Sequence, residues 1–572
     1  MKLVFKSFRN MLDLLSSVER HKVFNLILSQ WMISALDVIA IGLLSSILLS
    51  NQSIKIGPIF SAFSPEQVKL ISITLVVILF TLKGFLSYLN YVRLYLFLET
   101  LAISKSFQNF KAIDQNEEIK GGKFDSTDVA YAVTVGSVAR YLDLFGSSII
   151  LINEVAYLVA ILVTLFIFQP IISITAIVVF GSIMAGLHKI TRNITQGMGE
   201  VRGISEKNGI QLVQQFIISR REIFVYQLQP QFFESFLRER SKGIKASSKI
   251  QIAYLLPKYI FESGLMISGL TVLILNLYIL KNPIAESIAT LSIFLGAAAR
   301  LTPSVLRIQF YKNFAANSLG LAKTSISIFK DSPTQDSNNK SSVEIKTLPE
   351  NSNILVRFND IDFSYPDSPK STLSKINFEI HRNSFNCLIG VSGSGKSTLL
   401  DILLGLRNQN SGHIEFSQSL VQDGKLNLQN IGYVPQKISI FENTILYNIL
   451  LKENATIEEI FRVSEILEEV QLTEFINELP LGTSTLLTEN AGNLSGGQLQ
   501  RIGIARALIR GPKLLILDEA TNAIDSQTEK IILQNMLRKR ELTSVLLVTH
   551  SNRNTMFADQ VLELRNSSIL ID

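Results

Sequence analysis

Long apolar segments in the first half of the chain are the feature that most constrains its fold. A helix of about 20 apolar residues is long enough to cross the hydrocarbon core of a bilayer. Several runs approach or exceed that length, and they are apolar on all sides rather than striped, which argues against a soluble helical bundle. The runs are 23–49, 70–92, 147–168, 171–187, 252–280 and 284–299. The sequence therefore predicts a membrane α-helical bundle of about six transmembrane helices.

Basic residues set the expected orientation of these helices. The connections at 51–69, 169–170 and 281–283 are short and carry few lysines, whereas 189–249 is long and rich in Lys and Arg. Because cytoplasmic loops concentrate Lys and Arg, we expect both termini and everything after the sixth run to lie in the cytoplasm. These loops also explain the net charge of +6, so no nucleic-acid partner is expected. The expected location is the cell (inner) membrane, crossed several times.

The second half of the chain differs from the first in composition. Residues 331–350 are rich in Ser, Asn and Pro and poor in apolar side chains, which is typical of a tether. Beyond them, short β-rich runs such as NCLIG, NIGYVP, KLLILDEA and TSVLLVTH alternate with helical stretches. That alternation predicts a soluble α/β domain with a mostly parallel sheet. We expect a transmembrane domain at 1–330, a linker at 331–350 and a cytoplasmic domain at 351–572.

A glycine-rich stretch, GVSGSGKST, lies between an apolar strand and a predicted helix and fits G-x-x-x-x-G-K-[ST]. Its glycines let backbone N–H groups curl around phosphate oxygens, while Lys396 neutralises the β- and γ-phosphates and the Ser397 hydroxyl ligates magnesium. A glycine-rich turn with a chance lysine is the alternative, and the flanking strand and helix argue against it. The predicted ATP-binding residues here are Gly390, Val391, Ser392, Gly393, Ser394, Gly395, Lys396, Ser397 and Thr398.

A second acidic element, LLILDEA, supplies a partner for the metal. Its apolar residues predict a buried strand with Asp518 at the carboxyl end, which is the end where open parallel sheets bind ligands. We expect Asp518 to hold magnesium, directly or through water, and Glu519 to polarise the attacking water. Two carboxylates after a strand are common on protein surfaces, but the phosphate-binding loop in the same domain favours the catalytic interpretation.

Three single residues follow other predicted strands of this domain. Gln436, in YVPQ, is expected to contact magnesium and the attacking water, and His550, in LLVTH, to contact the γ-phosphate. Tyr365, in FSYPD, is expected to stack on adenine. Each has an ordinary structural explanation by itself, since a lone histidine or an aromatic side chain before proline usually serves packing. Their expected positions at one edge of the sheet favour a functional role.

The stretch LSGGQ, residues 494–498, raises a question because it is a second apparent phosphate cradle. Its serine and two glycines stand where a helix is predicted to begin, so they expose backbone N–H groups to an anion. One chain with one phosphate-binding loop has no evident use for a second cradle of its own.

Together these stretches resemble the ATP-binding cassette family from about Arg357 onward. GVSGSGKST, VPQ, LSGGQ, LLILDEATNAID and VTH follow the family's order and spacing. The resemblance implies an α/β P-loop nucleotide-binding domain that pairs head to tail with a second cassette, each nucleotide lying on one phosphate-binding loop and under the other chain's LSGGQ. It implies ATP and Mg²⁺ as cofactors. The residues it assigns to the partner's nucleotide are Ser495, Gly496, Gly497, Gln498 and Asp525.

Apolar spans fused ahead of a single cassette resemble the exporter branch of this family, in the form of a half-transporter. Both motif sets are intact, which favours a homodimer of identical chains, with a heterodimer as the alternative. The resemblance implies that ATP closes the cassettes and turns the membrane cavity outward, and that hydrolysis assisted by Glu519 resets it. The chain departs from the family pattern at Asn522, where a serine is usual, and in its short C-terminal segment.

Charged side chains inside the apolar runs bear on the substrate, because they are costly in a membrane. Lys258 and Glu262 are spaced i, i+4, which favours an ion pair on one helix face; Asp37, Lys83 and Glu154 are the other such residues. Arg300 and Arg307 follow the sixth run. They either reach lipid headgroups at a helix end or line a basic cavity for an anionic headgroup.

Short stretches of the first, fifth and sixth runs are similar to bacterial flippases of lipid-linked oligosaccharides: SALDVIAIGLL, LLPKYIFE and ARLTPSVLRIQ. That similarity implies a polyprenyl-pyrophosphate-linked oligosaccharide as substrate, with Arg300 and Arg307 engaging the pyrophosphate. Guanidinium groups suit phosphate oxygens well. The alternatives are a general exporter of drugs, lipids or peptides, and a nucleotide-gated channel or regulator built on the same domains.

Overall fold

The computed structural model describes residues 2–49, 65–113, 124–168, 170–279, 281, 283–329, 346–365, 371–488, 494–539, 541–550 and 553–571. The chain divides into two compact units, Met1–Gln335 and Asp336–Asp572. Residues 331–345 of the expected linker lie outside the described residues, and Lys346–Thr347 form the first strand, β1, of the second unit.

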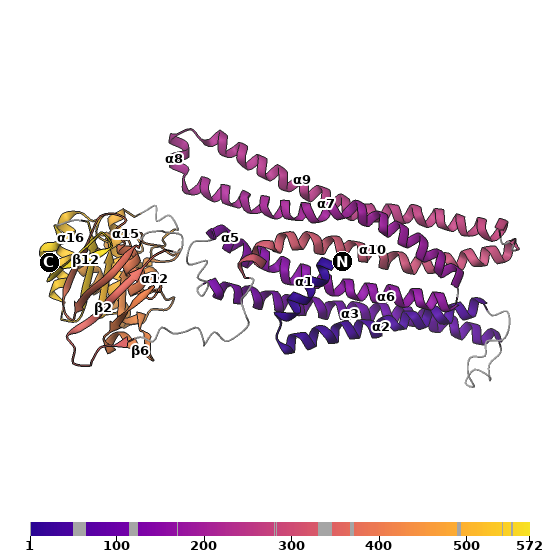
Figure 1. Ribbon diagram of the computed structural model, residues 1–572, viewed down its shortest axis with the longest axis horizontal. Coiled ribbons are helices and arrows are strands. Elements are labelled where there is room, and N and C mark those ends of the chain that lie inside the picture. Colours follow the sequence, from indigo (N-terminus) through magenta and orange to yellow (C-terminus); the bar gives the residue numbers. More distant parts are fainter. Residues whose placement is uncertain are drawn as a thin grey trace. The chain divides into compact units, whose positions relative to one another are not determined.

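In the described residues of the first unit, the regular secondary structure is helical (Figure 1). Its longest helices are α2, α3, α6, α7, α9 and α10, and within the described residues six helical segments are long and apolar enough to span a membrane. The expectation of about six spans is therefore confirmed. The helices are α1 (Lys2–Asp13), α2 (Ser17–Leu49), α3 (Pro65–Ile113), α5 (Ser126–Tyr131), η2 (Ala132–Gly136), η3 (Ala139–Phe145), α6 (Gly146–Phe168), α7 (Pro170–Ile218), α8 (Arg220–Val225), α9 (Gln229–Ile274), η4 (Leu275–Ile279) and α10 (Ile284–Ile328).

Several of these helices are much longer than the apolar runs within them. α3 and α7 each have 49 residues, α9 has 46 and α10 has 45. At 1.5 Å per residue a helix of this size is about 70 Å long, more than twice the thickness of the hydrocarbon core. Each must therefore extend well beyond a bilayer.

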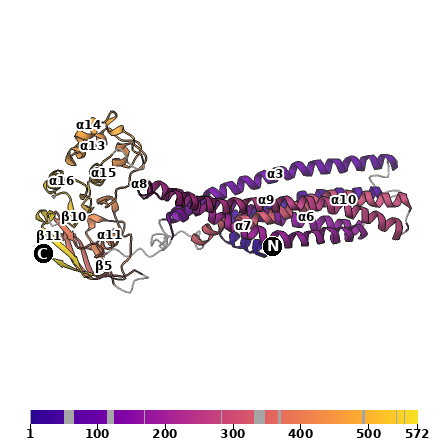
Figure 2. The same ribbon diagram turned by 90° about the horizontal axis from the view of Figure 1, so that it is seen from above.

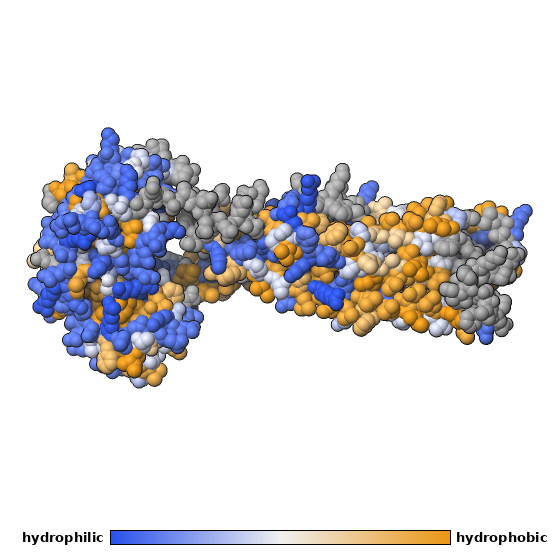
Figure 3. Space-filling view, turned by 90° about the horizontal axis from the view of Figure 1, so that it is seen from below, coloured by the Kyte–Doolittle hydropathy of each residue, from blue (hydrophilic) through white to orange (hydrophobic). Residues whose placement is uncertain are grey.

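Apolar side chains cover much of the outer surface of the helical unit, as the orange regions of Figure 3 show. Side chains such as Ile73, Val77, Val163, Ile167 and Val178 are exposed by 48–69%. A monomeric soluble protein rarely exposes so much contiguous apolar surface. The side chains that face away from the helical core are thus apolar, as contact with lipid requires.

The helical unit is held together by tight helix crossings. α3 lies along one edge of the unit (Figure 2), and α7 packs along both α9 and α10. At one crossing, a Cβ atom added to Gly320 of α10 would lie 2.4 Å from the backbone carbon of Gly199 in α7. Glycine at this position therefore permits a backbone approach that a larger residue would prevent.

The second unit contains two main sheets. The larger has the order β12-β11-β4-β10-β9-β8, and all its pairings except β11 with β12 are parallel. Its strands are β4 (Phe385–Ile389), β8 (Ile431–Val434), β9 (Leu514–Asp518), β10 (Ser544–Thr549), β11 (Gln560–Arg565) and β12 (Ser568–Ile571). The predicted α/β domain with a mostly parallel sheet is confirmed.

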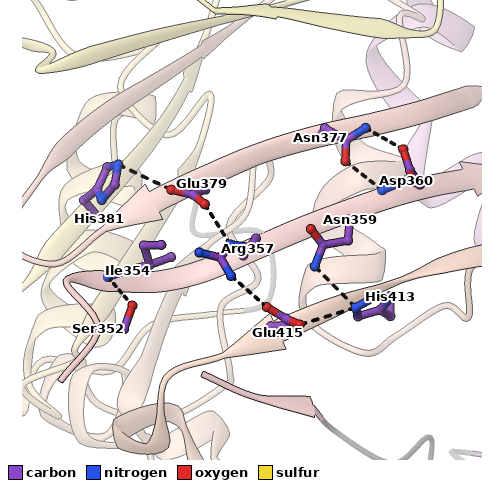
Figure 4. Close-up of polar contacts among 10 residues, drawn as sticks. All are labelled: Ser352, Ile354, Arg357, Asn359, Asp360, Asn377, Glu379, His381, His413 and Glu415. Carbon is purple, nitrogen blue, oxygen red and sulfur yellow. Dashed lines mark hydrogen bonds and ion pairs between the residues drawn. The ribbon is translucent and has the colours of Figure 1, made fainter. Parts of the chain in front are cut away.

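The smaller sheet is mainly antiparallel and has the order β1-β5-β2-β3. Its apolar face buries Phe358 and Phe378, whose rings stack 4.2 Å apart. On its other face Arg357 bridges Glu379 and Glu415 at 2.7 and 3.2 Å, which links three adjacent strands (Figure 4). The strands are β1 (Lys346–Thr347), β2 (Ile354–Phe363), β3 (Leu373–His381) and β5 (Ser411–Phe416), and a separate hairpin pairs β6 (Val421–Gln422) with β7 (Lys425–Leu426).

Helices pack on both sides of the central strands and contribute to their burial. Ile502 and Ala505 of α15, for example, belong to the same apolar cluster as Leu515 and Leu517 of β9. The helices are α11 (Lys396–Leu403), α12 (Ile445–Leu450), α13 (Ile457–Glu469), α14 (Thr473–Glu478), α15 (Gly496–Leu508) and α16 (Ser526–Arg538), with short turns η5 (Gln418–Leu420), η6 (Leu428–Asn430), η7 (Gly482–Ser484) and η8 (Asn554–Phe557).

We predict that Gly320→Ala destabilises the helical unit, because the added methyl group would collide with the backbone of α7. Overpacking of this kind costs about 1–3 kcal/mol. Gly296→Ala, on the same helix, is the matched control, because a Cβ atom at Gly296 would have no neighbouring atom within 4 Å. The measurement is the temperature at which half of the detergent-purified chain remains monodisperse in size-exclusion chromatography. Equal temperatures for the two variants would contradict the tight crossing.

Candidate functional site

The phosphate-binding loop joins β4 to α11 and has the backbone that its sequence predicts. Gly393 and Gly395 have φ of +78° and +107°, conformations that favour glycine. A Cβ atom on Gly390 would lie 2.7 Å from the carbonyl oxygen of Leu564 and 2.9 Å from Ser394 Oγ. The three glycines are thus needed for the loop to curl back on itself next to β11.

The loop closes around Lys396, whose Nζ donates to the carbonyl oxygens of Gly390 at 2.8 Å and Val391 at 3.1 Å. Burial lowers the pKa of Lys396, and Glu519 and Asp518 oppose that shift. Among the described side chains, the buried Ser394 Oγ has no hydrogen-bond partner. A buried cation beside an unsatisfied hydroxyl, at the start of a helix, fits the phosphate groups of a nucleotide.

Tyr365 lies beside this loop. Its hydroxyl is 3.1 Å from Thr398 Oγ1, and the Arg407 guanidinium lies over its ring, 5.1 Å from the centroid. The structure therefore brings Tyr365 next to the phosphate-binding loop, and its role in stacking on adenine stays a prediction. Arg407 carried no signal in the sequence, because its position depends on how the turn after α11 packs.

The catalytic residues predicted from three separate strands lie together around Glu519. Gln436 Nε2 donates to Glu519 Oε2 at 2.7 Å, and His550 Nε2 lies 2.6 Å from Glu519 Oε1. The Glu519 side chain is 11% exposed. These contacts place a carboxylate, an amide and an imidazole at the carboxyl edge of the parallel sheet, where a water could be held and deprotonated.

Glu519 has a φ of +52°, which is unusual for a residue with a side chain. Its backbone N–H donates to the carbonyl oxygen of Val548 in β10 at 3.0 Å, so the strained turn is tied to the neighbouring strand. Asn522 Nδ2 donates to Glu519 Oε2 at 3.2 Å. In the sequence Asn522 stands out only as a departure from the family pattern, and no signal there predicts this contact.

Asp518 is only 8% exposed, and Tyr433 donates to its Oδ2 at 3.4 Å. Burial, and secondly the neighbouring Glu519, raise the pKa of Asp518. Burial likewise raises the pKa of Tyr433 to about 12. Among the described residues no group of three or more His, Cys, Asp or Glu is placed to hold a metal by itself. The predicted metal ligands are side-chain oxygen atoms of Ser397, Gln436 and Asp518. Oxygen ligands suit Mg²⁺, and the phosphates of a nucleotide would supply further ones.

LSGGQ forms the start of α15. Ser495 is the N-cap: its Oγ accepts from the Gln498 backbone N–H at 3.2 Å, and Gln498 Oε1 accepts from the Ser495 N–H at 2.7 Å. This reciprocal capping engages the Ser495 N–H and hydroxyl, two groups that were expected to meet a partner's nucleotide. Gly496 and Gly497 follow in the first helical turn, whose N–H groups have no acceptor within the helix. Asp525 caps the next helix, α16, by accepting from the Thr528 N–H at 3.0 Å.

Of the two arginines expected in a substrate cavity, Arg300 and Arg307, the structure describes only the side chain of Arg307. The Arg300 side chain lies outside the described residues. Arg307 Nε donates to Glu154 Oε1 at 2.7 Å, and Ser304 donates to the other oxygen of this carboxylate at 2.9 Å. The Glu154 side chain is 6% exposed and that of Arg307 44%. Among the described residues, the two terminal nitrogens of Arg307 make no hydrogen bond, so its outer edge is free to meet an anion.

The other charged residues of the apolar runs contact side chains within the helical unit. Asp37, fully buried in α2, pairs with Lys83 of α3 at 2.7 Å and accepts from the Tyr157 hydroxyl of α6 at 2.5 Å. Lys258 does not pair with Glu262 as their spacing favoured. Its ammonium lies 5.8 Å from the centroid of the Tyr259 ring instead.

The fold and site together define a class: a helical membrane unit joined to an ATP-binding cassette. Residues 373–522, which lie in the second unit, match the ABC transporter family. The structure of a bacterial Atm1-family ABC exporter with ATP bound has a similar fold, with a TM-score of 0.72, 19% identity and coverage of 97% of this chain and 95% of that one. The chain as a whole therefore has the fold of an ABC exporter.

Two curated relatives add similarity at the level of sequence. An ATP-dependent lipid A-core flippase of Bordetella pertussis is 30% identical over 291 residues, which is 50% of this chain and 46% of the relative. An uncharacterized ABC transporter ATP-binding protein of Bacillus subtilis is 38% identical over 218 residues, 38% of this chain and 37% of the relative. This chain thus matches less than half the length of each relative.

We predict that acidification abolishes magnesium-dependent nucleotide binding when Asp518 becomes protonated. Because the pKa of Asp518 is raised, this loss occurs at a higher pH than it would for an aspartate with an ordinary pKa. Glu519→Gln removes the neighbouring negative charge, lowers the pKa of Asp518 and shifts the acid midpoint downward. The measurement is the magnesium-dependent part of fluorescent ATP-analogue binding as pH falls. His550→Asn is the control for loss of the imidazole contact. A midpoint unmoved by Glu519→Gln would contradict the coupling.

Proposed function

We propose that this chain is a half-transporter that works as a homodimer, hydrolysing ATP to move an amphipathic substrate across the cell membrane. The observation that carries the proposal is the convergence of Gln436 and His550 on Glu519, next to the phosphate-binding loop. A second cradle on the same chain, at Ser495, is explained by a second copy. Each copy lends its α15 to the nucleotide of the other, with the cassettes on the cytoplasmic side.

The hydrolytic step follows from the residues around Glu519. Lys396 and the loop N–H groups hold the β- and γ-phosphates, and the first turn of the partner's α15 covers the γ-phosphate from the other side. Glu519 takes a proton from the attacking water, while Gln436 and His550 fix the orientation of its carboxylate. Bound Mg²⁺, held by Ser397, Gln436 and Asp518, would neutralise charge that develops on the phosphate oxygens.

For the substrate, we propose a polyprenyl-pyrophosphate-linked oligosaccharide. The support is the outward edge of Arg307, whose two terminal nitrogens suit phosphate oxygens, and which the buried Glu154 holds in place. Arg300, seven residues earlier in the sequence, is expected close to the same helical face and is proposed as a second contact. The similarity to a lipid A-core flippase favours one other candidate, a different anionic glycolipid. Both substrates combine a phosphorylated, sugar-bearing headgroup with a lipid tail.

We predict that Glu519→Gln leaves ATP binding intact but slows hydrolysis about 10²–10⁴-fold, since a positioned general base contributes that factor. The measurement is steady-state phosphate release by the full chain in liposomes, together with the affinity for a fluorescent ATP analogue. Glu474→Gln, at an exposed position of α14, is the control and should keep the wild-type rate. Near-normal turnover in Glu519→Gln would show that another group is the base.

We predict that ATP-dependent flipping of a fluorescent polyprenyl-pyrophosphate glycan in liposomes is lost when Arg300 and Arg307 are both replaced by alanine. The double variant Arg307→Met plus Glu154→Gln separates two roles of Arg307. If Arg307 only neutralises Glu154, removing both charges restores flipping, because no buried carboxylate is left unpaired. If it binds the headgroup, flipping stays lost.

A parallel assay with labelled lipid A-core distinguishes the second substrate candidate. Flipping of that lipid alone would replace the first proposal. Wild-type protein that hydrolyses ATP but moves neither lipid would remove both substrates and leave the general exporter or gated channel.

A further inference from the structure

A cavity at the amino-terminal edge of the large sheet has no part in the proposed function. It has a volume of about 250 Å³ and lies between α13 and the carboxyl ends of α15 and α16 (Figure 2). β9 and β10 begin beside it, with Leu514 opposite Ser544, whereas Asp518, Glu519 and His550 stand at the other end of these strands. The cavity is therefore separated from the nucleotide site by the length of β9, five residues or about 16 Å.

The floor of the cavity is apolar. Ile466 and Met536 line it and are 5% and 6% exposed, and Leu515 and Val545 at the start of the two strands are almost fully buried. Leu508, the last residue of α15, completes the floor. An apolar cavity of about 150 Å³ binds a benzene ring, so this cavity has room for a ligand of roughly ten non-hydrogen atoms.

Two cations at the rim of the cavity have no counter-ion in contact. A Cβ atom added to Gly511 would lie 2.9 Å from Arg462 Nη2, so this guanidinium lies over the turn before β9, where Lys513 also lines the cavity. In the part of the chain that the structure describes, neither the Arg462 nor the Lys513 side chain makes a hydrogen bond or an ion pair. Lys539, the third lining cation, is paired with Glu469.

The charges of the rim indicate the charge of a ligand. With Glu469 held by Lys539, Glu465 is the one remaining carboxylate among the described lining residues, and it faces two unpaired cations. The rim therefore has an excess of one positive charge, which a single negative charge would neutralise. Guanidinium and ammonium groups both donate strong hydrogen bonds to a carboxylate, and here they stand beside an apolar floor.

We propose that this cavity binds a small amphipathic carboxylate, with a hydrocarbon chain of about six to eight carbons on the apolar floor and the carboxylate between Arg462 and Lys513. A neutral apolar molecule would leave both cations without a partner, and a short polar anion would leave the floor unfilled. The tail of a membrane lipid exceeds this volume. The ligand is thus distinct from the transported substrate, and the inference does not depend on the proposed function.

The test uses the full chain in lipid nanodiscs and a photoreactive hexanoate with a diazirine near its far end, a probe of about ten non-hydrogen atoms. On illumination the probe links to nearby side chains, and mass spectrometry of the digested chain locates the links. We expect links in the peptides that contain Leu508 and Met536. Labelling there should fall about tenfold or more in Arg462→Gln plus Lys513→Gln, because hydrogen bonds to charged groups are lost. Lys530→Gln, at an exposed position of α16, is the matched control and should keep wild-type labelling.

Two further variants keep the test independent of folding defects. Glu465→Gln removes the competing carboxylate and should increase labelling, a result that a misfolded chain would not give. Leu508→Trp fills the floor but keeps both cations, and it should abolish labelling of the peptide that contains Met536. The temperature at which the purified chain loses monodispersity shows whether each variant is folded. Unchanged labelling in the double variant, or links confined to peptides outside the cavity, would overturn the proposal.

Competition identifies what the cavity selects. Octanoate should displace the probe, whereas octanamide keeps the chain without the charge, and acetate keeps the charge without the chain. Each of these two should compete about tenfold more weakly than octanoate. If octanamide competes as well as octanoate, the rim does not select an anion, and if acetate does so, the site takes an adventitious anion only. Either result would refute the proposal, as would displacement of the probe by ATP, which binds at the opposite edge of the sheet.

Discussion

The burial of strand β9 is the constraint on which the nucleotide site depends. Leu514 to Leu517 are all 0% exposed, and β9 is paired on both sides, with β8 and with β10. A strand buried this completely cannot shift its register without exposing apolar side chains. The residues that follow it must therefore emerge at one fixed point of the sheet edge. Asp518 and Glu519 are those residues, and β4 and β10 deliver the phosphate-binding loop and His550 to the same edge.

The backbone conformation of Glu519 is strained, and contacts with neighbouring residues stabilise it. A left-handed conformation costs a residue with a Cβ atom roughly 1–2 kcal/mol. The bond from its N–H to Val548 and the three polar partners of its carboxylate hold it in that conformation. Strain of this kind persists where the surroundings over-determine the backbone, which is common at functional sites. The strain places the carboxylate within reach of both Gln436 and His550.

The sequence predicted the elements whose physical signal is local. Long apolar runs specify spans because a helix is the way a single segment satisfies its backbone in lipid, and the glycine-lysine loop requires its own backbone geometry. The helix lengths could not be read in this way, since the extensions of α7 and α9 are mixed in polarity. The contact of Asn522 with Glu519 depends on how the turn after β9 folds, which no spacing reveals. The i, i+4 spacing of Lys258 and Glu262 allowed a pair but did not enforce one, because such pairs contribute only about 0.2–0.5 kcal/mol.

Charges within the helical unit determine which helices can move relative to one another. Asp37 joins α2 to α3 through Lys83 and to α6 through Tyr157, and Glu154 joins α6 to α10 through Arg307. Breaking a buried pair leaves an uncompensated charge and costs about 3–5 kcal/mol. α7 meets α10 through the Gly199–Gly320 crossing, a bond from Gln309 to Thr191 worth about 1 kcal/mol, and an ion pair between Glu200 and Lys323. Both side chains of that pair are more than 40% exposed, and exposed pairs contribute only about 0–1 kcal/mol. A rearrangement of the helical unit therefore meets less electrostatic resistance between α7 and α10 than within the group of α2, α3, α6 and α10. A shift of α7, with α9 packed along it, leaves the pairs made by the buried Asp37 and Glu154 intact.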